Sequence, residues 1–177
     1  MNRYLLFSLS LLVSLFSCRE GVDPESLQVY DGPVNSAQNI HILHSDSAVL
    51  RSEITAPKQL EFANGNLEFP EGIDIQFFNL QGQLETTMRA DKGYFLRDQN
   101  LYKGEGNVQV KNLPKDQRLQ TEELFWNQKD STVYTDKNVI IKSDDNSIKG
   151  RGRGLKTNQS FSTYKILQPV GKFNTSK

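Results

Sequence analysis

Residues 107–111, Asn-Val-Gln-Val-Lys, and residues 138–142, Asn-Val-Ile-Ile-Lys, are two copies of one short motif separated by 31 positions. Successive side chains of a β-strand point to opposite faces, so Val108 and Val110 share one face, as do Val139 and Ile141. The stretch Ile73-Asp74-Ile75-Gln76-Phe77 alternates in the same way. We therefore expect short strands with one apolar and one polar face.

The similarity between the two copies extends well beyond the motif. Residues 88–112 and 119–143 align at the same spacing without a gap, and Tyr94-Phe95 falls opposite Phe125-Trp126. Each unit then contains an acidic, an aromatic and a β-branched segment, which we interpret as three strands. Repeated units of this length usually stack, because one unit cannot cover its own apolar stripe. The pattern predicts two facing sheets of roughly 12–16 short strands.

Turn-forming residues separate the expected strands, and helical periodicity is not sustained anywhere beyond residue 18. Glycine, proline, asparagine and aspartate favour tight turns because of their backbone preferences and local hydrogen bonds. The turn signals are Asn64-Gly65-Asn66, Pro70-Glu71-Gly72, Leu80-Gln81-Gly82, Asp98-Gln99-Asn100, Asp130-Ser131 and Asp144-Asp145-Asn146. The chain is therefore predicted to be all-β.

The N-terminal residues resemble a lipoprotein export signal. Arg3 precedes a short apolar stretch that ends at Cys18, the only cysteine in the chain. Such a signal is cleaved before the cysteine, which then carries the lipid. The stretch is shorter than the roughly 20 apolar residues that span a bilayer. An ordinary secretory signal with an accidental cysteine, and a short uncleaved anchor, are the alternatives.

These features divide the chain into three parts. Residues 1–17 are predicted to be the signal peptide, and residues 18–47 the lipid-attachment cysteine and an irregular tether. Residues 48–177 are predicted to form one β domain. A single cysteine leaves no disulfide within the chain, so burial and backbone pairing must stabilise the fold.

Composition argues against a nucleic-acid-binding protein. The 177 residues include 21 Lys and Arg and 21 Asp and Glu, so the formal net charge is zero. Nucleic-acid binding requires a concentrated basic surface. The mean hydropathy of −0.57 indicates thin alternating apolar stripes instead of solid apolar segments.

Several stretches together resemble the LptC family. They are Pro70-Glu71-Gly72-Ile73-Asp74-Ile75-Gln76-Phe77-Phe78, Gly82, Met88-Arg89-Ala90-Asp91, Tyr94, Gly104-Glu105-Gly106-Asn107-Val108, residues 119–126, Tyr134-Thr135-Asp136 and Gly150-Arg151-Gly152. The resemblance covers about residues 42–168, nearly the whole expected body.

The resemblance implies an open, twisted β-jellyroll, also called a β-taco or OstA/LptC-like fold, whose apolar trough shields acyl chains. It implies a non-catalytic role in moving lipopolysaccharide from an inner-membrane ABC transporter complex to an LptA-like periplasmic bridge protein. It also implies a periplasmic location in a Gram-negative bacterium. For the lipid anchor, the inner membrane is favoured over the outer membrane. Better-known members are held by an uncleaved transmembrane helix, and Cys18 departs from that pattern.

The alternating stripes supply candidate residues for the trough. They are expected either to line an acyl-chain trough or simply to form a core, depending on whether the sheets splay at one edge. Each buried CH₂ group contributes about 0.8 kcal/mol in either case. The candidates are Ile73, Ile75, Phe77, Val108, Val110, Val139 and Ile141.

An open sheet leaves two edge strands that a partner can extend by strand addition. We predict one edge along residues 49–55, facing the transporter, with Val49, Arg51 and Glu53. The other is predicted along residues 163–167, facing the bridge protein, with Thr163, Lys165 and Leu167. Pro57 and Pro169 are expected to stop pairing, because proline has no N–H to donate.

The residues that could take part in catalysis or metal binding do not form a recognisable site, so we predict neither an enzyme nor a bound cofactor. His41 and His44 lack the H-E-x-x-H spacing of a metalloprotease and should point to opposite faces of a strand, so no metal site is predicted. Asp91, Glu122, Glu123 and Asp136 resemble catalytic carboxylates only superficially, because Asp91 and Glu122 occupy equivalent repeat positions. A solvated outer face explains them more simply.

The run Gly150-Arg151-Gly152-Arg153-Gly154 has two interpretations. Arg151 and Arg153 are candidate contacts to headgroup phosphates, because guanidinium groups pair well with phosphate. Alternating glycines equally indicate a strand where another backbone approaches closely.

Two further functions remain alternatives to lipid transport. One is a scaffolding lipoprotein that binds partners by strand addition without lipid contact. The other is a surface carbohydrate-binding β module, which outward-facing aromatic side chains would favour. Adjacent aromatics in a strand point both ways, so the sequence leaves the facing of Tyr94, Phe95, Phe125 and Trp126 open.

Overall fold

The computed structural model describes residues 30–171, which contain eleven strands and one short 3₁₀ helix. Gly32 opens the compact unit to which all of the strands belong. The strands are β1 (Asn35–Asp46), β2 (Val49–Glu61), β3 (Leu67–Phe69), β4 (Ile73–Phe78), β5 (Leu84–Ala90), β6 (Lys92–Leu96), β7 (Leu101–Asn112), β8 (Gln117–Asn127), β9 (Thr132–Ser143), β10 (Ile148–Asn158) and β11 (Tyr164–Pro169); the helix is η3 (Arg97–Gln99).

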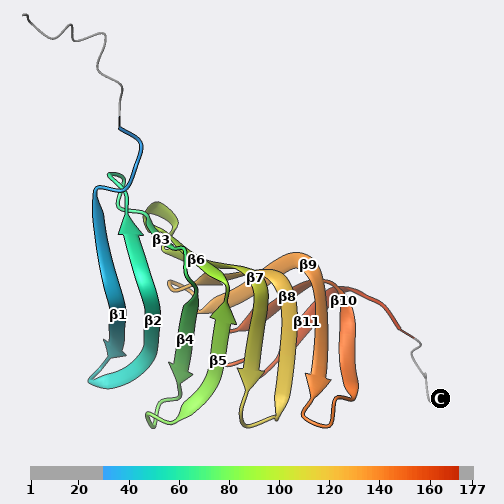
Figure 1. Cartoon of the computed structure of the whole chain (residues 1–177). Coiled ribbons are helices and arrows are strands. Elements are labelled where there is room, and N and C mark those ends of the chain that lie inside the picture. The colour runs from blue at the N-terminus through green and yellow to red at the C-terminus, as the bar shows by residue number, and fades with distance from the viewer. Residues whose placement is uncertain (1–29, 172–177) are drawn as a thin grey trace, which may run out of the picture. The chain divides into compact units, whose positions relative to one another are not determined.

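All strand pairs are antiparallel and belong to one twisted sheet that does not close into a barrel. The hydrogen-bonded order runs from β11 through β10, β9, β8, β7, β5 and β4 to β2, with β1 outside β2. Figure 1 shows β1 and β11 toward opposite ends of this row. The predicted all-β, open and twisted fold is confirmed.

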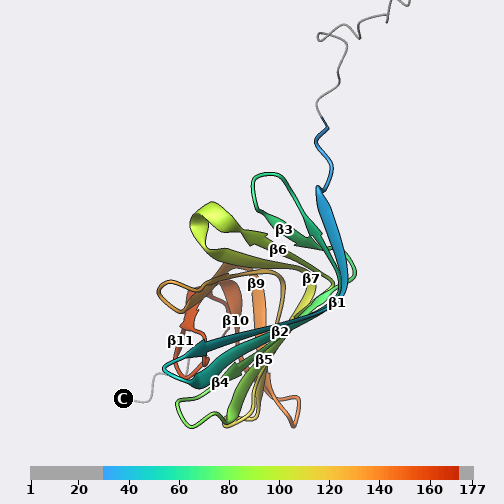
Figure 2. The ribbon, with the colours of Figure 1, turned by 90° about the vertical axis from the view of Figure 1, so that its left-hand side faces the viewer.

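The sheet bends on itself into two leaves, because the long strands pair with different neighbours in their two halves. Strand β7 pairs with β6 through residues 101–105 and with β5 through residues 109–112. Strand β2 likewise pairs with β4 and then with β3. We call the part containing β4 and β5 the first leaf and the part containing β3 and β6 the second leaf (Figure 2).

Residues with a left-handed backbone lie along the bend. The β7–β8 register shifts between Glu105 and Val108, where Gly106 has φ of 77°. A Cβ at Gly106 would lie 3.2 Å from Cβ of Asp91, at the break between β5 and β6. Glycine tolerates this conformation without steric cost, so Gly106 lets β7 turn from one leaf into the other.

Pro57 lies where β2 passes between the leaves. Strand β2 pairs with β4 through Thr55 and with β3 from Leu60 onward. The missing N–H of proline therefore falls in the gap between two pairings. The expectation that Pro57 stops pairing is wrong, because β1 pairs with β2 on both sides of it, at Ala56 and at Lys58.

The folded body begins earlier in the chain than predicted. Residues 35–46 form β1, which pairs with β2 along almost its whole length, so the folded body begins well before residue 48. Only Ala37, Ile40 and Ile42 of β1 are even partly buried. Such a weak apolar pattern does not distinguish this strand from an irregular segment.

The two copies of the repeat differ in their number of strands. The first copy spans the end of β5, all of β6 and β7, so it contains three strands as predicted. In the second copy, the acidic and aromatic segments both belong to β8, and the β-branched segment belongs to β9. Long bent strands that serve both leaves explain why the described residues contain eleven strands and not 12–16. All six predicted turns fall between strands.

Cys18 and the predicted signal peptide lie outside the described residues. Within residues 30–171, no helix has the length and apolar character needed to cross a membrane.

Candidate functional site

The apolar stripe predicted from the alternating residues lies between the two leaves. All seven candidates are at most 3% exposed, and each belongs to one hydrophobic cluster. They are Ile73, Ile75, Phe77, Val108, Val110, Val139 and Ile141. Because these side chains are buried against one another, the stripe forms the core of this structure. Full burial of each such side chain contributes roughly 1.5–3 kcal/mol to stability.

The apolar stripe continues into half-buried residues at both ends of the row of strands. Ile40, Ile42 and Leu67 pack against the core near β1, and Tyr164 and Ile166 do so on β11. A depression of about 530 Å³ beside β11 is lined in part by Ile148, Tyr164 and Ile166. Apolar surface of the interior therefore reaches solvent at each end.

Aromatic rings from both leaves meet in the interior. The Trp126 ring lies edge-on to Phe77, with centroids 4.7 Å apart, and is stacked with Tyr102 at 5.2 Å. Phe77 belongs to the first leaf and the other two to the second. Burial raises the pKa of the Tyr102 hydroxyl to about 12, because the charged phenolate is poorly solvated there.

The paired aromatics of the repeat do point both ways. Trp126 is buried, and Phe95 packs on Tyr102 with ring centroids 4.6 Å apart. Their neighbours lie on the other face, where Phe125 stacks on Tyr134 at 5.2 Å and Lys103 lies over the Tyr94 ring.

The β10–β11 turn joins the two leaves at the side opposite the bend. The carbonyl oxygen of Ser160 accepts hydrogen bonds from Oγ1 of Thr86 and Nδ2 of Asn112, and the Lys115 ammonium donates to the carbonyl of Ser162. Phe161 is only 6% exposed and lies beside Ile141 and Tyr164. This turn therefore partly covers the open side of the fold near the C-terminal strands.

The free edges of the sheet are β1 and β11. Within residues 30–171, β1 pairs only with β2, and β11 pairs only with β10. Lys165 and Leu167 lie on β11, and Thr163 immediately precedes it. The edge predicted at residues 49–55 is misplaced, because Val49, Arg51 and Glu53 belong to β2, which β1 covers.

Arg151 and Arg153 are both exposed on β10, next to the last strand. Arg151 lines the depression that also contains Ile166, whereas Nε of Arg153 donates to the carbonyl of Asp136 at 3.1 Å. A Cβ at Gly152 would lie 2.3 Å from the carbonyl oxygen of Gln168. Close approach of β11 thus accounts for Gly152, and the headgroup role of the arginines remains a prediction.

Some charged residues on the outer face form ion pairs with one another. Lys103 forms ion pairs with Glu105 at 2.8 Å and with Glu123 at 3.0 Å. Its hydrogen bond lowers the pKa of Glu105 and raises its own. Asp91, Glu122 and Asp136 are exposed, so the acidic repeat positions face solvent.

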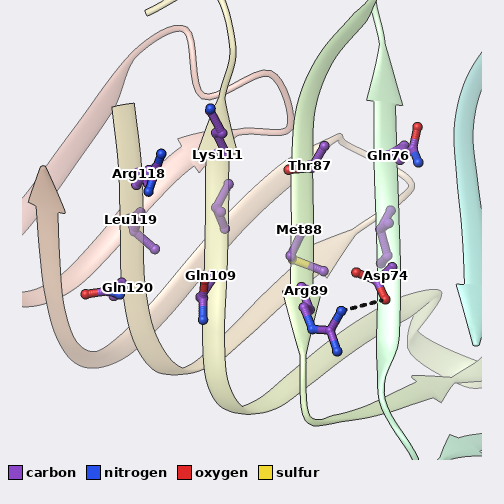
Figure 3. A pocket seen from close by; sticks show the side chains of 12 residues that line it. Asp74, Gln76, Thr87, Met88, Arg89, Gln109, Lys111, Arg118, Leu119 and Gln120 are labelled. Carbon is purple, nitrogen blue, oxygen red and sulfur yellow. Dashed lines mark ion pairs between the residues drawn. The ribbon is translucent and has the colours of Figure 1, made fainter. Parts of the chain in front are cut away.

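A depression of about 440 Å³ lies on the outer face of the first leaf, and Figure 3 shows the side chains that line it. Side chains from neighbouring strands line it, including Thr87, Gln109 and Gln120, and Arg89 pairs with Asp74 at 3.6 Å. This face is thus polar where the reverse face of the same strands is apolar.

The histidines do not form part of a metal cluster. Nε2 of His41 contacts Oε1 of Glu53 at 2.7 Å, and His44 lies opposite Ser52 in the β1–β2 pairing. Within residues 30–171, no group of three or more potential His, Cys, Asp or Glu ligands is brought together.

The sequence did not predict a polar pocket on the open side of the fold, near Ser52 and Trp126. It has a volume of about 210 Å³ and joins the start of β2 to the ends of β8 and β10. Residues 52 and 126 are separated by most of the body, and no sequence pattern links them.

Comparison with known proteins adds one finding. Residues 4–171 match the family described as "Lipopolysaccharide-assembly, LptC-related". No curated protein matches the chain.

Proposed function

Since the chain belongs to the lipopolysaccharide-assembly, LptC-related family, we propose that it accepts lipopolysaccharide from an inner-membrane ABC transporter and passes it to a periplasmic bridge protein. Family membership itself implies a role in lipopolysaccharide transport in the cell envelope, as a transport component not known as an enzyme. The individual transfer steps and the acyl-chain path are our proposal.

The continuous apolar interior is the observation that supports this path. Buried stripe residues from β4 to β9 connect the half-buried Ile42 at one end with Ile166 at the other. An acyl chain that enters between the leaves exchanges water for apolar side chains, at about 0.8 kcal/mol per CH₂ group. Such contacts are non-directional, so a chain can slide without breaking any single strong bond.

The free strands β1 and β11 supply the proposed partner surfaces. An edge strand presents unpaired N–H and C=O groups that another strand can extend. We assign β11 to the bridge protein and β1, instead of the start of β2, to the transporter. The cargo then moves along the row of strands from β1 to β11.

The proposed anchor is a lipid on Cys18, with the body in the periplasm and the inner membrane as the favoured location. An anchor of this kind keeps the folded body near the transporter. Energy for transport would come from ATP hydrolysis by that partner, because the proposed conduit is passive.

Reconstituted transfer tests this function. Membranes that contain the transporter and lipopolysaccharide are mixed with the full chain, and the lipopolysaccharide bound to the chain is measured with and without ATP. Transfer that depends on ATP and on an intact β1 supports the proposal. A chain that binds the transporter yet never acquires lipopolysaccharide would exclude the conduit role.

One observation favours scaffolding as a second candidate function. The stripe residues are already packed against one another and at most 3% exposed, which is what a protein that never admits lipid would show. A scaffold would bind partners through β1 and β11 with equal affinity in the presence and absence of lipopolysaccharide.

A further inference from the structure

The mouth pocket, as we name the 210 Å³ polar hollow, lies where the first leaf approaches the ends of the second. Arg51 and Ser52 of β2 line it from one leaf, and Trp126 and Gln128 line it from the other. A single buried water needs only roughly 10–15 Å³ on the same kind of measure. The pocket therefore has room for a polar group of several atoms.

Three hydrogen-bond donors in this pocket are buried without a partner among the described residues. They are Nη1 of Arg51, Oγ of Ser52 and Nε1 of Trp126. Ser52 is 1% exposed and Trp126 is 2% exposed. Buried polar atoms nearly always have a hydrogen-bond partner, so three unpartnered donors around one hollow indicate a missing acceptor.

Two of the three donors are held in place by their neighbours before any ligand arrives. Trp126 is fixed between Phe77 and Tyr102 by ring contacts of 4.7 and 5.2 Å. Ser52 is paired with His44 on one side and Phe77 on the other. Preorganised donors lose little conformational entropy on binding, which favours a specific ligand.

The chemistry of the donors selects an oxyanion. The guanidinium of Arg51 is permanently charged and suits phosphate oxygens, while a hydroxyl and an indole N–H add neutral bonds. Asp46 also lines the pocket, and within the described residues no ion pair joins it to Arg51. Its carboxylate and the nearby Gln128 are suited to accept hydrogen bonds from sugar hydroxyls.

We propose that the mouth pocket binds the phosphate group of a phosphorylated sugar headgroup, while the attached acyl chain enters the interior beside Phe77 and Trp126. The assignment of this phosphate to a lipid headgroup rests on the proposed function. The phosphate site itself rests on the three donors. This site is distinct from Arg151 and Arg153, which lie on β10.

The single tryptophan makes the test specific. Trp126 is the only tryptophan in the chain, so its indole N–H gives one side-chain signal in a ¹H–¹⁵N spectrum of the full protein. The signal is followed during titration with inorganic phosphate, glucosamine 1-phosphate, lipopolysaccharide and phosphatase-treated lipopolysaccharide. Arg51→Gln and Ser52→Ala are compared with Arg89→Gln, a matched control on the outer face.

The proposal predicts that millimolar phosphate and glucosamine 1-phosphate shift the indole signal, and that Arg51→Gln weakens this binding at least tenfold. Arg89→Gln should leave it unchanged. Phosphatase treatment should weaken lipopolysaccharide binding in the unmodified chain but not in Arg51→Gln.

Three results would overturn the proposal or part of it. An indole signal that no phosphate compound shifts, in a folded protein, would mean that the pocket holds only water. Phosphate binding with no preference for phosphorylated lipopolysaccharide would overturn the lipid source. If the unmodified chain binds phosphate but does not bind lipopolysaccharide at all, the proposed function is contradicted and the phosphate site is still supported.

Discussion

The side-chain amide of Asn112 donates a 2.6 Å hydrogen bond to the carbonyl oxygen of Ser160. Asn112 ends β7 in the first leaf, and Ser160 lies in the turn that follows β10 in the second leaf. The same carbonyl accepts a bond from Thr86, which is fully buried. This contact holds the two leaves together on the side away from the bend.

Replacing Asn112 with Ala should weaken this closure. The substitution removes one donor to the Ser160 carbonyl, which keeps its bond from Thr86, and the net loss of such a bond typically costs about 0.5–1.5 kcal/mol. We expect the free energy of unfolding, measured by urea denaturation, to fall by this amount. Gln109→Ala, on the exposed face of the same strand, is the control, and an equal loss there would argue against a closing role for Asn112.

Phe77→Ala should cost considerably more stability. Phe77 is 1% exposed and contacts the Trp126 ring across the leaves, and truncation of a buried phenylalanine typically costs about 3–5 kcal/mol. Urea denaturation should show this loss together with a changed fluorescence spectrum of Trp126. Phe78→Ala, half-buried on the other face of β4, should have a smaller effect, and equal effects would contradict the assignment of faces.

Gly152→Ala should displace the last strand. The added Cβ would lie 2.3 Å from the carbonyl oxygen of Gln168, so the backbone of β11 must move. Overpacking of this kind typically costs about 1–3 kcal/mol. Hydrogen exchange should become faster in residues 164–169, whereas Gly171→Ala, with no atom near its added Cβ, should leave exchange unchanged. Unaltered exchange in Gly152→Ala would show that the approach of β11 is looser than described.

Alkaline pH should destabilise the fold through Tyr102. Its pKa rises from 10.0 to about 12 on folding, so the unfolded chain ionises first. The stability present below pH 10 is lost as the pH rises toward about 12, by roughly 2–3 kcal/mol at 1.36 kcal/mol per pH unit. Urea denaturation between these pH values measures the slope of the free energy of unfolding against pH. Tyr102→Phe should remove this part of the slope, and an unchanged slope would mean that Tyr102 is not the group responsible.

Alternation of side chains made the inner face predictable. Ile73, Ile75 and Phe77 are all buried, and the residues between them are half-buried, because strand side chains must point to opposite faces. The turns were predictable for a similar reason, since Gly, Asn and Asp carry local backbone preferences that act regardless of tertiary context.

Features that depend on tertiary arrangement were not predictable. Strand β1 has little apolar pattern of its own and is recognised only through its pairing with β2. The mouth pocket combines Arg51, Ser52 and Trp126, which meet only after the sheet has bent. The number of strands was overestimated because strands of typical length were assumed, whereas β7 and β8 are 12 and 11 residues long and run through the bend.

Site-specific photocrosslinking from neighbouring residues of each edge strand tests the central claim most directly. Ile42 and Ile166 pack against the core, whereas their neighbours Leu43 and Leu167 are 58% and 52% exposed. A photoreactive residue is placed at each position, and crosslinks to lipopolysaccharide are measured during ATP-driven transfer. The account predicts crosslinks from positions 42 and 166 and few from 43 and 167. Equal crosslinking from all four folded variants, or none from 42 and 166, would contradict passage of the acyl chains between the leaves.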